Sequence, residues 1–334
     1  MRLLNQIFKF LFLTALMGAF ALAAQLRQTA VIELPGNPGF GPVAIANGYV
    51  VIVHGSDNSL DVFDPQKRRV VTQVFGMHRP TGLAVDDQSG KIYVANSGDN
   101  TIAVVSSKDW KVADTIQFQE TPGPLQLAPG GKKLFVGNSR AQSISLVQLD
   151  RGNLVTTVPV GGSAKGMTFD PARNVLLASL EDTREVIALD PALQIVARYP
   201  LIASMPTGIV VDAQARRIYV AVRSAVVALD ADTGKEIKRV AAPAGVNSLW
   251  LDPADGVLYT AGGGSVLRIK AGNGRFEVEQ ELSAKVRGQT LAYDPGRKLV
   301  FVPGGQEGHA KLLIVRSIEN TTPAAGSPTK STSW

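Results

Sequence analysis

Three cationic side chains stand out because they fall at nearly equivalent places in similar stretches of the sequence. Arg79 and Arg287 each lie a few residues before an apolar run, and Lys165 lies at the start of a third such run. Guanidinium and ammonium groups at the same end of neighbouring elements can bind phosphate or another anion through charge-assisted hydrogen bonds. The alternative is ordinary solvated loop charge, which is the default for exposed Lys and Arg.

Imidazole and amide groups accompany these cations. His54, Asn96 and Asn138 occupy one column of the sequence pattern, directly after an apolar run, and each can hydrogen-bond to a ligand. The other two histidines, His78 and His309, are expected in the same sector as His54. A three-histidine metal site is therefore a conceivable but less favoured alternative, because nothing in the spacing supports its geometry.

Trp250 is the aromatic candidate. A nucleobase or another ring can stack on an indole, but an indole can equally fill a void in a core. The other positions of its column hold small or medium-sized side chains. The full column is Ala44, Ala84, Gln126, Thr168, Val210, Trp250 and Ala292.

Composition and missing motifs exclude several classes of chemistry. The 334 residues are 45% hydrophobic and 19% charged, which is typical of a folded chain, and they include no cysteine. Disulfides, zinc-thiolate sites, iron–sulfur clusters and cysteine nucleophiles are therefore excluded. The sequence contains no Gly-x-Ser-x-Gly, His-Glu-x-x-His or Gly-x-x-x-x-Gly-Lys motif. We predict no catalytic residue, no cofactor and no resident metal.

The elements that must position these residues belong to a sevenfold repeat. Units begin near Gly41, Thr81, Gly123, Lys165, Thr207, Asn247 and Gln289. One column fixes their register at intervals of 40 to 42 residues: Ala46, Asp86, Ala128, Asp170, Asp212, Asp252 and Asp294. This column is usually followed by Pro, Gly or a basic residue, so we interpret its aspartates as turn formers and not as catalytic groups.

Each unit holds four short apolar runs separated by turn signals, which predicts strands and not helices. In the second unit the runs are 83–85, 92–95, 101–105 and 111–118. Seven four-stranded units of about 40 residues predict an all-β, seven-bladed β-propeller. The last unit has only three runs, 291–294, 299–302 and 311–317. We expect Thr29–Leu34 to supply its fourth strand and so close the ring.

The two ends of the sequence are expected to lie outside the propeller, which we place at 28–318. Residues 1–23 combine Arg2 and Lys9 with a short apolar run and Ala-Leu-Ala, which is typical of a cleaved signal peptide. An uncleaved anchor helix is the alternative. Cleavage after Ala23 would lower the formal charge from +6 to +4 and leave no membrane anchor. Residues 319–334 are rich in Pro, Ser and Thr and are predicted to be a disordered tail. We expect a periplasmic or secreted monomer.

The segment Tyr93-Val94-Ala95-Asn96, followed by Asp99-Asn100-Thr101, resembles the YVTN repeat of a family of seven-bladed propellers. Phe135-Val136-Gly137-Asn138 and Tyr219-Val220-Ala221 are similar to further copies, and the resemblance covers all seven units. It implies the propeller fold and, together with the export signal, the periplasmic YncE-type group, which is linked to binding of single-stranded DNA. The motif asparagine is absent from later units, where Ser179 and Val222 replace it.

The sequence therefore predicts a non-catalytic binding propeller for a polyanion, with single-stranded nucleic acid as the partner that the resemblance implies. Loops that join the fourth strand of one unit to the first strand of the next share a face with the loops between second and third strands, and the site is expected there. One alternative is a protein scaffold or an accessory subunit of a periplasmic redox enzyme. A lactonase-like hydrolase is a further, less favoured one.

Overall fold

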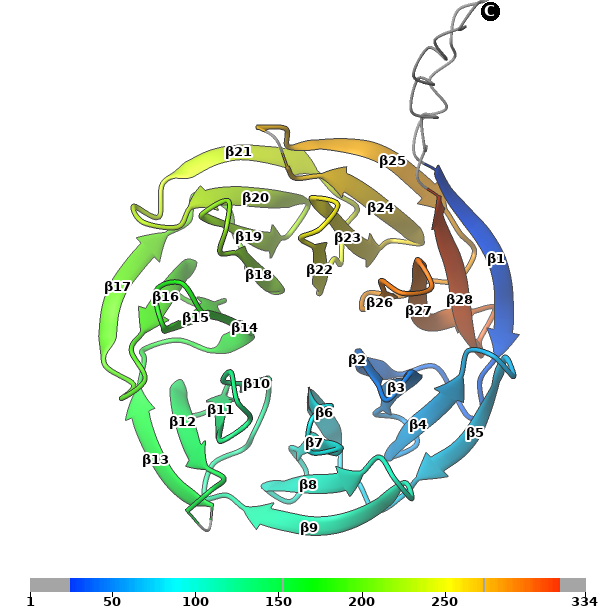
Figure 1. Cartoon of the computed structure of the whole chain (residues 1–334), viewed down its shortest axis with the longest axis horizontal. Helices are drawn as coiled ribbons and strands as arrows, with labels where there is room; N and C mark the ends of the chain where they lie inside the picture. Colours follow the sequence, from blue (N-terminus) through cyan, green and yellow to red (C-terminus); the bar gives the residue numbers. More distant parts are fainter. Residues whose placement is uncertain (1–24, 152, 273, 319–334) are drawn as a thin grey trace, which may run out of the picture.

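The computed structural model describes residues 25–151, 153–272 and 274–318, and these residues form a ring of seven four-stranded antiparallel sheets (Figure 1). No helix is present in the described residues, so the prediction of an all-β, seven-bladed β-propeller is confirmed. The predicted signal peptide at 1–23 and the predicted tail at 319–334 lie outside the described residues. Across the described ranges, no helix is long and apolar enough to cross a membrane.

In blades one to six, the strands follow the sequence from the channel outwards. Blade one contains β2 (Phe40–Ala46), β3 (Tyr49–His54), β4 (Ser59–Asp64) and β5 (Arg69–Val74). Blade two contains β6 (Pro80–Asp86), β7 (Lys91–Asn96), β8 (Thr101–Ser106) and β9 (Lys111–Gln117). Blade three contains β10 (Leu125–Leu127), β11 (Lys133–Asn138), β12 (Ser143–Gln148) and β13 (Leu154–Pro159). Blade four contains β14 (Ala164–Asp170), β15 (Val175–Leu180), β16 (Glu185–Leu189) and β17 (Ile195–Pro200).

Blades five and six have the same order, and blade seven differs from them. Blade five contains β18 (Ile209–Asp212), β19 (Arg217–Val222), β20 (Ala225–Asp230) and β21 (Glu236–Ala241). Blade six contains β22 (Leu249–Asp252), β23 (Val257–Gly262), β24 (Ser265–Lys270) and β25 (Glu277–Ser283). Blade seven contains β26 (Ala292–Asp294), β27 (Leu299–Gln306), β28 (His309–Ile318) and, as its outer strand, β1 (Gln25–Glu33).

The ring closes through the pairing of β1 with β28, as the sequence predicted. The register runs from Gln25 opposite Ile318 to Glu33 opposite Lys311, with one irregularity between Gln28 and Ala30. The closing strand begins at Gln25 and therefore before the predicted boundary at residue 28. Blade seven thus joins the two ends of the propeller, and β1 covers the edge of β28 that would otherwise be exposed.

The hydrophobic core is divided among the contacts between neighbouring blades. Seven clusters of buried side chains each combine residues from two adjacent blades, and the seventh joins blade seven to blade one. The second strands are buried on both faces, as in β7, where five of the six residues are buried. This confirms the interpretation of their consecutive apolar residues as strands covered on two sides.

The aspartates of the repeating column form hairpin turns, as predicted. Asp170 accepts hydrogen bonds from the backbone N–H groups of Ala172 and Arg173, at 3.0 and 3.3 Å. Asp294 accepts one from Arg297 at 3.0 Å. These short local bonds stabilise the turn from the first strand to the second, and they recur around the ring.

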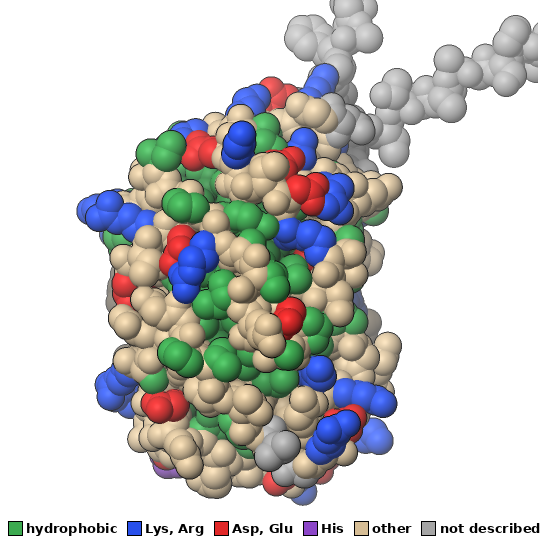
Figure 2. Space-filling model, turned by 90° about the vertical axis from the view of Figure 1, so that its left-hand side faces the viewer, with side chains coloured by type: hydrophobic (Ala, Val, Ile, Leu, Met, Phe, Trp, Pro, Cys, Tyr) green, Lys and Arg blue, Asp and Glu red, His purple; other side chains and the backbone are tan. Residues whose placement is uncertain are grey.

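The outer strands face solvent on the rim of the ring. In β9 only one of seven residues is buried. On the face that contains β17, hydrophobic side chains gather near the middle while charged ones surround them (Figure 2). Val196 on β17 and Ile202 in the following loop are exposed by 57% and 84%. This apolar rim lies apart from both cavities of the channel described below.

Candidate functional site

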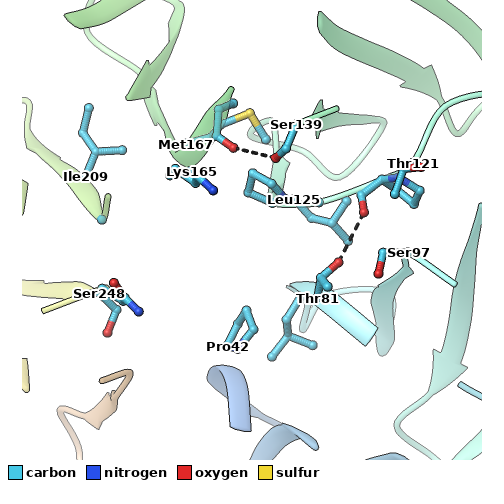
Figure 3. A pocket seen from close by; sticks show the side chains of 18 of the residues that line it. Pro42, Thr81, Ser97, Thr121, Leu125, Ser139, Lys165, Met167, Ile209 and Ser248 are labelled. Atoms are coloured by element: carbon cyan, nitrogen blue, oxygen red, sulfur yellow. Dashed lines mark hydrogen bonds between the residues drawn. The ribbon is translucent and has the colours of Figure 1, made fainter. Parts of the chain in front are cut away.

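A cavity of about 540 Å³ lies at the mouth of the central channel (Figure 3). Thr121 in a loop between blades lines it, and so do Ser97 and Ser139 in loops that join second and third strands. The two kinds of loop therefore meet on one face, as the sequence predicted. The lining residues include three cations, Arg79, Arg140 and Lys165, but no aspartate or glutamate. The cavity is thus electropositive and suited to an anion.

Arg79 presents an exposed guanidinium on a firmly held backbone. Its backbone N–H donates to Oδ1 of Asn58 at 2.8 Å, from the neighbouring blade. Its carbonyl oxygen accepts from the backbone N–H and the hydroxyl of Ser97, at 3.1 and 2.9 Å. The φ angle of Arg79 is 50°, a left-handed conformation that is strained for a residue with a Cβ, here directly before Pro80. Such strain persists where the surrounding hydrogen bonds impose it, and it is often found at binding sites.

Arg140 is the lining cation that the sequence reasoning missed. It lies in the hairpin loop between β11 and β12, and its side chain is exposed. In the ranges that the structure describes, neither Arg79 nor Arg140 forms an ion pair, so both guanidinium groups are available to a ligand. A signal was present, because Arg140 follows Asn138 and Ser139 as Gly98 follows Asn96 and Ser97. Aligning these hairpin loops, and not only the loops between blades, would have found it.

Lys165 lies at the start of β14 and also lines the cavity. Its ammonium group is 3.0 Å from a carboxylate oxygen of Glu181, and both side chains are partly exposed. This pair lowers the net charge that Lys165 brings to the cavity, but an ion pair at such exposure is weak and readily exchanged for a ligand. The three cations come from blades two, three and four and therefore form an arc along one side of the mouth.

Hydroxyl groups complete the lining. Thr81 and Ser139 donate to backbone carbonyl oxygens, of Pro122 at 3.2 Å and Ala164 at 3.1 Å, so their hydrogens are already used. Ser248 accepts from the N–H of Leu291 at 3.0 Å. Among the described residues, the hydroxyl hydrogens of Ser248 and Thr121 make no hydrogen bond, so both can donate to a ligand. The site therefore offers guanidinium, ammonium and hydroxyl donors to an anionic group.

Arg287 lies in a different hollow on this face. It lines a cavity of about 680 Å³ together with Lys285, Glu307 and the hairpin glycines of blades six and seven. Its backbone forms an antiparallel bridge with Gly305. The structure thus brings Arg79 and Lys165 together, as the sequence analysis expected, but places Arg287 outside their cavity.

The three residues of the histidine–asparagine column are buried, and none of them lines the cavity at the mouth. His54 lies between Oδ2 of Asp61 and the carbonyl oxygen of Asn37, with each ring nitrogen 2.8 Å from its acceptor. Burial opposes a charged imidazole. However, these hydrogen bonds and the charges of Asp61 and Asp57 outweigh burial and raise the pKa of His54 above its ordinary value of 6.5. His54 therefore holds the loop between β1 and β2.

The two asparagines stabilise their own hairpins. Asn96 donates to the hydroxyl of Thr101 at 3.1 Å, and Asn138 donates to the hydroxyls of Ser143 and Ser145 at 3.0 and 2.8 Å. Since Thr101 and Ser143 begin the strand after the turn, each asparagine ties the end of a second strand to the start of the third. Their hydrogen bonds favour a structural role.

The histidines do not gather into a metal site. His78 is exposed, with Nε2 3.8 Å from Oδ2 of Asp99, and His309 is exposed on β28. Both ring nitrogens of His54 already have partners. Among the described residues, no group of three or more His, Asp or Glu side chains could hold a metal ion.

Trp250 lies outside the cavity that contains the cations. It is half-buried on β22 and packs edge-on against Tyr293, with ring centroids 5.4 Å apart. It also lines a second cavity of about 500 Å³ that does not include Arg79, Arg140 or Lys165. The structure therefore does not combine Trp250 with the cationic site.

The comparison with protein-family models finds the NHL repeat over residues 77–105, which span β6 to β8 of blade two. This is the unit that contains Tyr93-Val94-Ala95-Asn96, and the match agrees with a propeller built from repeats. No curated protein matches the chain.

Three solved structures show the same fold. Hydrazine synthase of Kuenenia stuttgartiensis is 15% identical, with a TM-score of 0.74, and the match covers 87% of this chain and 99% of that one. The Cps50 (Swd1) β-propeller domain of Myceliophteria thermophila is 12% identical, with a TM-score of 0.72, over 88% and 100% of the two chains. A streptogramin B lyase is 13% identical, with a TM-score of 0.72, over 90% and 100%. At these identities the likeness shows the fold alone, so the function must be argued from the site.

Proposed function

We propose that this protein is a non-catalytic binding propeller that captures a polyanion at the channel mouth. The observation that carries the proposal is the lining of the 540 Å³ cavity, which holds Arg79, Arg140 and Lys165 and no carboxylate. Arginine binds phosphate through paired N–H donors, and hydrogen bonds to Asn58 and Ser97 fix the backbone of Arg79 at the edge of the cavity.

Single-stranded nucleic acid is the polyanion that we favour. The three cations lie on consecutive blades, so a chain with repeated phosphates can contact them in turn. The cavity falls within the usual range of small-molecule sites, about 300–1,000 Å³, which admits part of a single strand but not a duplex. The resemblance to YVTN propellers of the periplasmic YncE type supports the same ligand class. With the predicted signal peptide at residues 1–23, it also supports a periplasmic location.

The test is a titration of a fluorescein-labelled single-stranded 12-nucleotide DNA with the purified protein, followed by anisotropy at several salt concentrations. Three phosphate contacts predict a log–log salt slope of about −2, at roughly −0.7 per contact on a single strand. Arg79→Gly should weaken binding about tenfold and reduce the slope by about 0.7. Glycine is the right replacement because it adopts the left-handed conformation at this position without strain.

Arg68→Gly is the matched control. Arg68 is also an exposed arginine with a left-handed backbone, at φ 55°, but it lies in the turn between β4 and β5 and lines neither channel cavity. The control removes the same charge and makes the same backbone change, so it should leave affinity nearly unaltered. Equal losses in the two variants would show a dependence on net charge alone. Such a result, or no binding at 25 mM salt, would overturn the proposal.

A further inference from the structure

A second cavity lies further along the channel, towards the turns that follow the first strands, and has a different chemical character. Leu249 lines both cavities. The second cavity has a volume of about 500 Å³ and is lined by the first strands of blades four, five and six and by the turns that follow them. Most of its lining is apolar, and includes Phe169, Pro171, Val210, Trp250, Leu251 and Pro253. No lysine or arginine lines it, in contrast to the mouth cavity.

Aromatic rings are held firmly around this cavity. Trp250 packs edge-on against Tyr293, with an interplanar angle of 70°. Phe169 stacks on Phe135, with ring centroids 6.3 Å apart and an angle of 16°. Because each ring is fixed by a second ring, neither must be ordered when a ligand binds, which lowers the entropic cost of binding.

One buried carboxylate, that of Asp212, also lines the cavity. Asp212 is 8% exposed, and its Oδ1 accepts a hydrogen bond from the backbone N–H of Ala215 at 2.8 Å. Two other aspartates of the same column have a basic partner three residues later. Asp170 pairs with Arg173 at 2.6 Å and Asp294 with Arg297 at 2.5 Å.

Asp212 lacks such a partner, because position 215 is alanine. Arg217 lies opposite Asp212 in the sheet, but its side chain pairs with Asp230 at 3.4 Å. Arg216 pairs with Asp232. In the part of the chain that the structure describes, Asp212 therefore forms no ion pair. A buried carboxylate without a counter-charge is costly, and a cation that enters the cavity would remove that cost.

We propose that this cavity binds a small organic ammonium ion, free in solution, that carries methyl, alkyl or aromatic substituents. The carboxylate of Asp212 would neutralise the positive charge, and the face of Trp250 would attract it through the cation–π interaction. The apolar walls would cover the substituents. A strongly hydrated inorganic cation gains little from such walls, so the same features select against Na⁺ and K⁺.

Calorimetric titration of the purified protein with phenyltrimethylammonium tests this site. The expected dissociation constant is millimolar or lower, and Asp212→Asn should raise it at least tenfold. Asparagine has the same shape and can still accept the Ala215 hydrogen bond, so the turn should persist. The matched control is Asp86→Asn, which makes the same change in the blade-two hairpin, outside the cavity. It should leave the dissociation constant unchanged.

Two further measurements separate charge from simple burial. The neutral analogue tert-butylbenzene has the same shape without the charge, and it should bind at least tenfold more weakly than the cation. Trp250→Phe should retain part of the affinity and Trp250→Leu should lose most of it, while thermal melting confirms that both variants fold. Equal affinity for the cation and its neutral analogue, or an unchanged affinity in Asp212→Asn, would overturn the proposal.

The source of the ammonium group can be tested in the same way. A short peptide that contains trimethyllysine presents the same headgroup on a polypeptide. Binding no tighter than that of free phenyltrimethylammonium is expected for a small-molecule site. Tenfold tighter binding of the peptide would overturn the assignment to a free ligand.

Discussion

The imidazole of His54 donates from Nδ1 to Oδ2 of Asp61, at 2.8 Å, in the buried interior of blade one. Its Nε2 faces the carbonyl oxygen of Asn37, also at 2.8 Å. Both partners are acceptors, and a neutral imidazole has only one N–H to offer. The charged imidazolium can donate to both at once, and this arrangement, together with the charges of Asp61 and Asp57, favours the protonated form of His54 in the folded protein.

This arrangement predicts a pH dependence of stability. The pKa of His54 is raised in the folded protein, so its contribution to the free energy of unfolding is fully present below about pH 6.5. The contribution is lost as pH rises through the higher pKa of the folded state. The midpoint of urea unfolding, measured from pH 5 to 9, should therefore fall in the alkaline half of that range.

Asp61→Asn supplies the control for this pH dependence. Its amide oxygen can still accept from Nδ1, but the negative charge that favours the imidazolium is gone. The alkaline fall in the unfolding midpoint should shrink in this variant. An identical pH profile in wild type and variant would show that another group is responsible. His54→Ala should cost about 3 kcal/mol at pH 6, because it leaves Asp61 buried without its cation.

Asn138 is predicted to contribute to stability and not to ligand affinity. Its two hydrogen bonds join the ends of β11 and β12, while its buried Oδ1 has no partner. Asn138→Ala should therefore lower the free energy of unfolding by about 1 kcal/mol. The affinity for single-stranded DNA should stay within about twofold. A tenfold loss of affinity without a loss of stability would restore the ligand-binding role that the sequence pattern suggested.

The fold was predictable because each repeat carries its own local signals. The aspartate column set the register of the hairpins, and the three-stranded last unit required an extra strand, which β1 provides. The first residues of β1 were missed, since Gln25 to Arg27 alternate too weakly in polarity to be told from a linker. Leu26 nevertheless anchors this end of the strand, because its side chain is only 3% exposed.

The site was only partly predictable, because strand position does not give side-chain direction or depth. Lys165 and Thr168 both belong to β14, but three residues of strand span about 10 Å, which separates the two ends of the channel. Trp250 lies outside the mouth cavity, although Ser248 and Leu249, the two residues before it, line that cavity. Asn96 and Asn138 end buried strands, and their side chains turn into the hairpin and not towards the channel. Aligning the repeats by sequence does not reveal the direction in which a side chain points.

Leu26 is predicted to be a main anchor of the closing strand. Its side chain packs in the cluster between blades six and seven, with Tyr259 and Leu313. Its backbone N–H donates to the side chain of Gln280 on β25, and its carbonyl oxygen accepts from the same side chain at 3.1 Å. Leu26→Ala should lower the free energy of unfolding by about 3 kcal/mol. Val31→Ala, on an exposed position of the same strand, should change it by less than about 0.5 kcal/mol. Equal small effects of the two substitutions in a denaturant titration would show that Leu26 is not a main anchor of the closing strand.

Asn58 is predicted to act on ligand binding through Arg79, without touching the ligand itself. It accepts the backbone N–H of Arg79 from the neighbouring blade and so helps to hold Arg79 in its left-handed conformation. Asn58 has a left-handed backbone of its own, at φ 52°, so Asn58→Gly removes the acceptor without straining the turn. We expect the affinity for single-stranded DNA to fall about fivefold while the salt slope stays the same, because no phosphate contact is lost.

Asn100→Gly makes the same change in the hairpin of blade two, where φ is 57° and the side chain holds no loop of the mouth cavity. It should bind like wild type, and an equal loss in both variants would mean that hairpin stiffness, and not the position of Arg79, sets the affinity.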